Sequence, residues 1–323
     1  MLNRMLRHVR YRYVGVIAAY AIAIASAQAA EITVDDYYGV QFEGKIEKGD
    51  YEKLFAAAGE IASEMYNNPD RSIYPVLHLF SPGGDLAEAM KIGRLVRQLH
   101  WMTTAPENLP NGLKDVQKHT MDQLKNSQEN YMCASACFFI FVAGTERWVG
   151  YRNHHDDIIL GIHRPYLSDI DLKRMSSKDA MSTAANTHSV VENYLREMNV
   201  PAKYADLMFS IPKDNIQWLN PTDIKPDLGG FIPELSDWVD ARCDNRTDIE
   251  KMTARSLEAK MDRIRHEMEE IKKTGRLEEL ETFSPDEDRI REMLENKDDQ
   301  RGECERKLRV ELSKQGNKEV WGR

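Results

Sequence analysis

Hydrophobic and polar positions follow two different spacings over residues 31–242, as expected of a chain that alternates between strands and helices. Residues 37–43 alternate weakly and predict a strand, whereas residues 50–65 place apolar side chains on one helical face. Residues 75–80 (PVLHLF) form a short apolar run that ends near two glycines, and helical spacing resumes over residues 85–99. A strand, a Gly-Gly turn and a helix in this order make the βα unit of a mostly parallel sheet, so we assign the α/β class.

The rest of this region predicts further elements of both kinds. Residues 131–144 indicate a turn and an apolar helix, residues 157–162 a strand, and residues 168–198 a long, mostly polar helix. Residues 210–221 indicate a loop or short strand that leads into another helix. Residues 100–131 are polar and show no clear β pattern, and we predict that they form a surface insertion or a lid.

The composition changes near residue 245, and helix formers and charged residues dominate from there on. Apolar residues recur there every three to five positions, as in a narrow amphipathic stripe: Met252, Leu257, Met261, Ile264, Met268 and Ile271. Ser284, Pro285 and Glu287 are typical of a helix start with a capping box, which predicts a second helix. We therefore divide the mature chain into an α/β domain (30–242) and a charged helical arm (243–323), a helical hairpin or coiled coil. The alternative for the arm is a solvated, partly disordered tail.

The four cysteines form two pairs in the sequence. Cys243 precedes the first helix of the arm and Cys304 lies late in the second, so an antiparallel hairpin makes them a candidate disulfide. Cys133 and Cys137 lie four residues apart, a spacing that suits a disulfide poorly within one helical turn. We expect these two to be small buried side chains, with a thiol nucleophile at either position as an alternative.

The first 29 residues have the three parts of a secretory signal peptide. Arginines without any acidic residue precede a short apolar run at residues 13–25, and Ala27-Gln28-Ala29 provides the pattern that signal peptidase cleaves. We expect a periplasmic or secreted protein, in a compartment where disulfides form. The alternative is an uncleaved anchor, formed by residues 13–29, in the inner membrane.

Composition and charge narrow the class of protein further. The chain has 323 residues, and 44 basic residues against 53 acidic ones give a formal charge of −9. This balance lacks the basic excess of a nucleic-acid-binding protein, so we expect no such partner. No apolar stretch reaches the roughly 18 residues of a spanning helix, which excludes a multi-pass membrane protein. We expect no cofactor, because glycine-rich nucleotide motifs are missing, and no metal, because residues 154–157 (HHDD) lack a further spaced ligand.

Several positions suit nucleophilic catalysis. A serine attacks a carbonyl only when a neighbouring base takes its proton and a third group orients that base. Ser135 lies between a turn and an apolar helix, and His163 follows a strand that is predicted to be buried. Gly83 and Gly84 have no side chains, so a substrate carbonyl can approach their N–H groups. Each feature alone has an ordinary explanation, such as an N-cap, a loop or a turn, and only their combination favours catalysis.

In this combination the chain resembles the Clp protease proteolytic subunit, of the ClpP/crotonase-like superfamily of serine peptidases, over residues 37–225. Residues 76–84 (VLHLFSPGG) are similar to the family's strand and Ser-Pro-Gly-Gly loop, and residues 134–147 to its nucleophile turn and helix. Residues 162–165 (IHRP) are similar to its histidine motif, and residues 213–215 (KDN) loosely resemble its acidic motif. Cys133 and Cys137 depart from the family, which usually has small residues there.

The resemblance implies a ClpP-like spiral of βα units and a catalytic triad. Ser135 would be the nucleophile, His163 the general base and Asp214 the group that orients the base. The oxyanion hole would lie at Gly83, Gly84 and Ala136, with the backbone N–H groups of Gly84 and Ala136 as donors.

The resemblance also implies an activity and partners. It implies a serine endopeptidase that cleaves peptides or unfolded proteins through an acyl-enzyme. Outside the cytoplasm we expect no ATPase partner and disfavour chemistry on coenzyme A thioesters. By analogy, the helix over residues 168–198 implies a homo-oligomer. The alternative is a non-catalytic protein of the same fold that binds a partner in the cell envelope.

Overall fold

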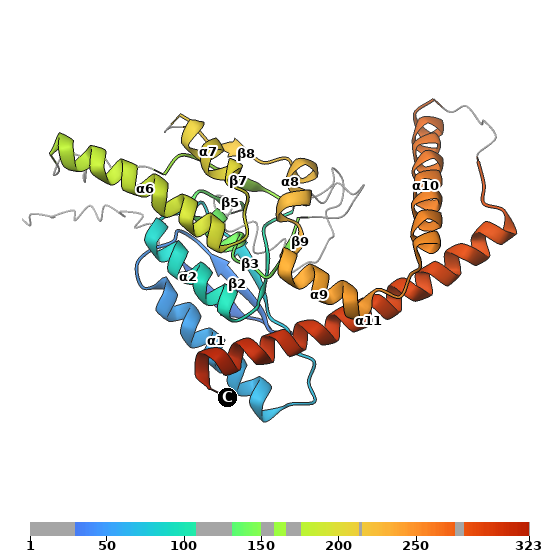
Figure 1. Cartoon of the computed structure of the whole chain (residues 1–323), viewed down its shortest axis with the longest axis horizontal. Helices are drawn as coiled ribbons and strands as arrows, with labels where there is room; N and C mark the ends of the chain where they lie inside the picture. Colours follow the sequence, from blue (N-terminus) through green and yellow to red (C-terminus); the bar gives the residue numbers. More distant parts are fainter. Residues whose placement is uncertain are drawn as a thin grey trace, which may run out of the picture.

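The computed structural model describes residues 30–107, 131–149, 158–165, 176–212, 215–274 and 281–322. Strands and helices alternate up to residue 243, and two long helices follow them (Figure 1). The mixed α/β class with C-terminal helices is therefore confirmed. Among the described residues, no helix combines the length and the apolar composition needed to cross a bilayer. The predicted leader (1–29) lies outside the described residues.

Within the described residues, the larger sheet has six strands in the order β1-β2-β3-β4-β6-β9. Their bounds are β1 Glu31–Val34, β2 Gly39–Glu43, β3 Val76–Phe80, β4 Met102–Thr104, β6 Glu146–Trp148 and β9 Gly230–Phe231. The four central strands run parallel, and β1 and β9 pair antiparallel at the two edges. The mostly parallel sheet predicted from the βα pattern is confirmed.

A smaller sheet begins where β3 ends, with the strand order β5-β7-β8. Its strands are β5 Cys133–Ala134, β7 Leu160–Ile162 and β8 Gln217–Trp218. Ser81, directly after β3, joins the two sheets, because its N–H donates to the Met132 carbonyl (2.7 Å) and its carbonyl accepts from Ala134 N–H (3.0 Å). This link brings the turn that follows β3 against the turn that follows β5.

Helices cover the sheets and enclose the core. Helices α1 (Asp50–Asn67) and α2 (Leu86–Gln98) lie side by side on the larger sheet (Figure 1). Each buries one apolar face, as the 3.6-residue spacing predicts. Helix α4 (Ala136–Phe141) lies between α2 and the sheets, and all six of its residues are buried. The remaining helices of this part are α6 Ser177–Glu197, α7 Lys203–Ser210 and α8 Pro221–Leu228.

The predicted insertion at residues 100–131 is wrong in its first part. Strand β4 pairs with both β3 and β6 in the middle of the larger sheet, and Trp101 before it is 1% exposed. Three residues are too few for an alternating pattern to be recognised. Pattern analysis misses β6, which also has three residues, and β9, which has two, for the same reason. The rest of the predicted insertion, residues 108–130, lies outside the described residues.

The C-terminal part consists of α9 (Pro233–Cys243), α10 (Asp248–Thr274) and α11 (Pro285–Trp321). Helix α11 starts with the predicted capping box, in which Ser284 Oγ accepts from Glu287 N–H (3.3 Å) and Glu287 Oε2 accepts from Ser284 N–H (2.8 Å). Both helices predicted for the arm are therefore present. The division of the chain at residue 243 stays a prediction.

The end of α11 packs against the α/β part of the molecule. It contacts α1 and α2, and its residues Leu308 and Leu312 are buried. Gly316 lies so close to the end of α2 that a Cβ there would be 2.6 Å from the Gln98 carbonyl oxygen. The last turns of this charged helix therefore help to enclose the core.

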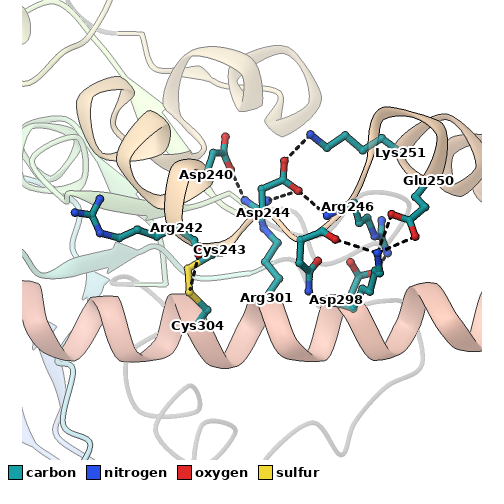
Figure 2. A network of polar contacts seen from close by, with 12 residues as sticks. Asp240, Arg242, Cys243, Asp244, Arg246, Glu250, Lys251, Asp298, Arg301 and Cys304 are labelled. Carbon is teal, nitrogen blue, oxygen red and sulfur yellow. Dashed lines mark hydrogen bonds and ion pairs between the residues drawn. A yellow bond between two sulfur atoms is a disulfide. The ribbon is translucent and has the colours of Figure 1, made fainter.

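At the base of the arm, Cys243 of α9 forms a disulfide with Cys304 of α11, at a Cα–Cα distance of 5.6 Å. This is the pair that the hairpin interpretation proposed. Figure 2 shows that ion pairs lie beside the bond and join α9, α10 and α11. They are Asp240–Arg301, Asp244–Lys251, Arg246–Asp298 and Glu250–Lys297.

Candidate active site

The turn after β3 is a glycine pair whose conformation excludes side chains. Gly83 and Gly84 have φ angles of 102° and 147°. Ile46 holds the turn on one side, since its N–H donates to the Gly83 carbonyl (2.9 Å) and its carbonyl accepts from Asp85 N–H (2.9 Å). A Cβ on Gly84 would lie 2.1 Å from the Ile46 carbonyl oxygen. Only glycine fits here, which is what a site that admits a substrate carbonyl requires.

Ser135 lies against this glycine turn. A Cβ on Gly83 would be 2.8 Å from Ser135 Oγ, so the serine hydroxyl and the glycine backbone are neighbours. Ser135 has φ 59° and ψ −123°, in the region that non-glycine residues avoid. Such a conformation costs about 1–3 kcal/mol and is concentrated at functional sites. A sharp, strained turn between a strand and a helix is the usual way to expose a nucleophilic serine.

The ordinary structural role of Ser135 does not apply. A serine before a helix normally accepts a hydrogen bond from the first helical turn. Ser135 occupies the N-cap position of α4, yet its side chain makes no capping hydrogen bond. Its side chain is half-buried and lines a cleft instead. The hydroxyl is therefore placed for a purpose other than capping.

The expectation of two free thiols beside Ser135 is wrong. Cys133 and Cys137 form a disulfide with a Cα–Cα distance of 5.3 Å, and both side chains are buried. The expectation assumed helical geometry across all five residues. In the structure Cys133 belongs to β5 and Cys137 to α4, and the turn at Ser135 brings their side chains together. A thiol nucleophile at either position is excluded while the bond is intact.

His163 follows β7, next to the serine turn. The parallel register pairs Ala134 with Gly161 at the end of the ladder, so Ser135 directly follows β5 while His163 directly follows β7. The Ser135 N–H also donates to the Gly161 carbonyl at 3.0 Å. The predicted nucleophile and the predicted base are thus mounted on adjacent strands of one sheet.

The contact of the His163 ring with the main chain requires a proton on Nδ1. Its Nδ1 lies 2.7 Å from the carbonyl oxygen of Arg164. A carbonyl can only accept a hydrogen bond, so Nδ1 carries the proton and Nε2 is the basic nitrogen. Arg164 is held in turn, because its guanidinium donates to the Phe209 carbonyl. In the neutral tautomer that is protonated at Nδ1, Nε2 is the nitrogen that can take a proton from a serine.

A cleft of about 810 Å³ brings these groups together. Predicted site residues that line it are Gly83, Gly84, Ser135, Ala136 and His163. Asp214 lies outside the described residues, so its predicted orienting role stays a prediction. Among the described groups, the Arg164 carbonyl oxygen fulfils the function of holding the imidazole in one tautomer.

Sequence reasoning missed several residues of this cleft. Its lining also includes the apolar residues Ile46, Leu86 and Phe139, and the exposed residues Lys45 and Lys48. None of these follows from a local pattern, because each reaches the cleft through packing between distant segments.

Glu88 and Arg147 are buried charged residues of the α/β part, and Glu88 holds a loop of the cleft. Glu88 of α2 accepts hydrogen bonds from Gly49 and Tyr51 N–H (both 2.9 Å), which fixes the loop that carries Lys48. Burial raises the pKa of Glu88, but these N–H groups and Lys91 outweigh it and lower the pKa below its ordinary value. Burial lowers the pKa of Arg147 to about 9, with Arg97 adding to the effect.

The described residues hold no group of three or more His, Cys, Asp or Glu that could bind a metal ion. The sequence HHDD at residues 154–157 lies outside them. The described cleft offers its own side chains and main-chain N–H groups. A hydroxyl, an imidazole with a basic nitrogen and glycine N–H groups are the components of acyl transfer.

Comparisons with known proteins add little. No family model matches the chain, and no curated protein matches it. One solved structure with some likeness is a mutant of the membrane-bound stomatin-specific protease 1510-N. It is 14% identical over 58% of this chain and 74% of that one, with a TM-score of 0.33. A likeness this distant carries no statement about fold or activity.

Proposed function

We propose that this chain is an exported, ATP-independent serine endopeptidase of the ClpP-like type. The observation that carries the proposal is the geometry of Ser135. Its backbone is held in a disfavoured conformation, its hydroxyl does not cap the helix that it precedes, and that hydroxyl faces the glycine turn in a cleft shared with His163. A non-catalytic protein of the same fold has no need to maintain such a serine.

The proposed reaction is an acyl transfer in two steps. Ser135 Oγ attacks the carbonyl carbon of a peptide bond while His163 Nε2 takes its proton. The N–H groups of Gly84 and Ala136 stabilise the oxyanion, and His163 returns the proton to the leaving amine. Water then hydrolyses the acyl-enzyme by the same route. In this proposal Asp214 stabilises the imidazolium, in addition to the Arg164 carbonyl.

The cleft supports peptides or loosely folded proteins as substrates. It is open and of a size that accepts a few side chains, and apolar residues such as Ile46, Leu86 and Phe139 form much of its wall. We propose that the protein acts outside the cytoplasm after loss of residues 1–29, and that it forms a homo-oligomer.

A fluorophosphonate probe tests the proposal directly. The reagent forms a phosphorus–oxygen bond with an activated serine and releases fluoride, so it reports the nucleophile without knowledge of the substrate. We expect the wild type to be labelled once per chain and the Ser135→Ala variant not at all. Labelling that persists in Ser135→Ala, or none in a folded wild-type sample, would contradict the proposal and favour a binding protein. After labelling, peptidase activity can be measured with unfolded casein as the substrate.

A further inference from the structure

The turn that carries Ser135 is anchored unequally on its two sides. On the strand side, the N–H groups of Cys133, Ala134 and Ser135 each donate to a carbonyl of a neighbouring segment at 2.9–3.0 Å. On the helix side, the first main-chain bond back to the turn runs from Phe138 N–H to the Ser135 carbonyl (3.1 Å). The Cys133–Cys137 bond provides a covalent link across the turn, from β5 to the first turn of α4.

This link spans the residue whose backbone conformation is unfavourable. Ser135 has a φ of 59°, and a serine free to relax prefers negative φ values by roughly ten-fold or more. Both cysteine side chains are 0% exposed, so the disulfide cannot contact a substrate. Its effect on chemistry must therefore pass through the placement of Ser135, which makes Cys133 and Cys137 positioning residues.

We propose that the Cys133–Cys137 disulfide holds Ser135 in its attacking conformation, so that the serine is fully reactive only while the pair is oxidised. This inference rests on the proposed peptidase function. Reduction by a dithiol such as dithiothreitol transfers two electrons and two protons to the bond, which gives two thiols and the cyclic disulfide of the reagent. The freed turn then relaxes toward ordinary backbone angles and withdraws the hydroxyl from the glycine turn.

The fold depends on this bond less than the reactivity of Ser135 does. Helix α4 is buried on all sides and contacts α2, β4 and β7, and the Phe139 carbonyl accepts a hydrogen bond from Tyr194 Oη (2.8 Å). These contacts keep the helix in place when the sulfurs are replaced by the small side chain of alanine. The double variant Cys133→Ala/Cys137→Ala is therefore expected to fold with its nucleophile misplaced.

The experiment compares this variant with Cys243→Ala/Cys304→Ala, which removes the other disulfide and leaves the cleft intact. The maximal rate of fluorophosphonate reaction and the probe concentration at half-saturation are measured separately. We expect the maximal rate to fall at least ten-fold in the cleft variant with little change in half-saturation, and to stay within two-fold in the control. Each single cleft variant should lose as much as the double, because either one breaks the bond.

Reduction provides a reversible version of the same test. In the Cys243→Ala/Cys304→Ala background, once mass spectrometry of alkylated thiols shows that dithiothreitol has reduced the buried bond, the probe reaction should be slower by the same factor, and re-oxidation should restore it. The cleft variant should not respond to reduction. A cleft variant that reacts at the wild-type rate, or a control that slows equally, would overturn the inference.

Amide hydrogen exchange of the segment around Ser135 decides the matter independently of activity. We expect faster exchange of the Ser135 N–H, now bonded to the Gly161 carbonyl, in the cleft variant and not in the control. Unchanged exchange would overturn the inference even if the rate had fallen. A wild type that exchanges as expected but never reacts with the probe would count against the proposed function alone.

Discussion

The two disulfides of this molecule lie in contrasting surroundings. The Cys133–Cys137 bond joins residues four apart at the cleft, where its neighbours are buried apolar side chains. The Cys243–Cys304 bond joins residues 61 apart at the base of the arm, where ion pairs between three helices lie beside it (Figure 2). The first region is apolar and contains a strained residue. The second combines a small apolar cluster around Cys243 with ion pairs between regular helices.

Loop length shows why the two bonds serve different purposes. Closing a loop in the unfolded chain contributes roughly 2 kcal/mol for the short separation and roughly 4 kcal/mol for the long one. The bond of the arm is therefore the better stabiliser, because it restrains far more of the unfolded chain. The bond of the cleft adds less to stability, and its effect is concentrated on one backbone turn.

The largest expected difference between the two regions appears when one histidine in each is substituted and the rate of the probe reaction is measured. His163→Gln should slow the reaction of Ser135 with the fluorophosphonate probe at least about 1000-fold, because no other group is assigned to take the proton. His266→Gln, on the exposed face of α10, should leave the rate unchanged. Rates are followed by mass spectrometry of the labelled chain. Equal rates for His163→Gln and the wild type would show that His163 is not the base.

The second effect is on stability. The arm variant, which should lose less activity than the cleft variant, should lose more stability. Cys243→Ala/Cys304→Ala should lower the free energy of unfolding by about 4 kcal/mol, and Cys133→Ala/Cys137→Ala by about 2 kcal/mol. Denaturant unfolding under oxidising conditions measures both. If the cleft variant lost more stability than the arm variant, the arm bond would not be the better stabiliser of the two.

The sequence predicts one of these regions better than the other. The arm could be anticipated in detail, because the capping box at Ser284 and the pairing of Cys243 with Cys304 depend on local helical signals and hairpin geometry. At the cleft, the order of strand, glycines and helix could be anticipated, but the Cys133–Cys137 bond could not. Its formation depends on the positive φ of Ser135, which no local propensity indicates for a serine.

Short elements and distant contacts mark the other limit of sequence reasoning. Strand β4 is three residues long, and only its pairing with β3 and β6 identifies it. Ile46 lines the cleft because its main chain binds the glycine turn. Main-chain hydrogen bonds of this kind do not depend on the hydrophobic pattern of the sequence. Contacts between distant segments determine such short strands and cleft residues, and the pattern of a single segment does not indicate these contacts.

A third comparison uses one glycine from each region. Gly84→Ala should lower the free energy of unfolding by at least about 2 kcal/mol, since its Cβ would lie 2.1 Å from the Ile46 carbonyl oxygen at a φ of 147°. Gly302→Ala should raise it by up to about 1 kcal/mol, because this glycine lies inside α11 with open space around it. Denaturant unfolding of the two single variants checks both signs. A stable Gly84→Ala variant would mean that the glycine turn can move.

The smallest expected effect is the response of the two regions to acid. The Lys297 ammonium, aided by the Thr247 N–H, lowers the pKa of Glu250 to about 2. A carboxylate with a lowered pKa stabilises the folded state fully above its ordinary pKa of 4.5, and this contribution is lost as the pH falls toward 2. We therefore expect the junction of α10 and α11 to loosen between pH 4.5 and 2. The Glu250→Gln variant should lack much of this change, and Glu311→Gln, an exposed glutamate of α11, should keep it.

Hydrogen exchange measured across that pH range, and corrected for the intrinsic effect of pH, compares α10 with the Ser135 turn in one sample. The turn is held by main-chain hydrogen bonds and a disulfide, neither of which titrates between pH 4.5 and 2. We expect the protection of α10 to fall first while the turn keeps its protection. If both segments lost protection together, the arm and the cleft would unfold as one cooperative unit, and the contrast between a charge-stabilised arm and a covalently held Ser135 turn would not hold.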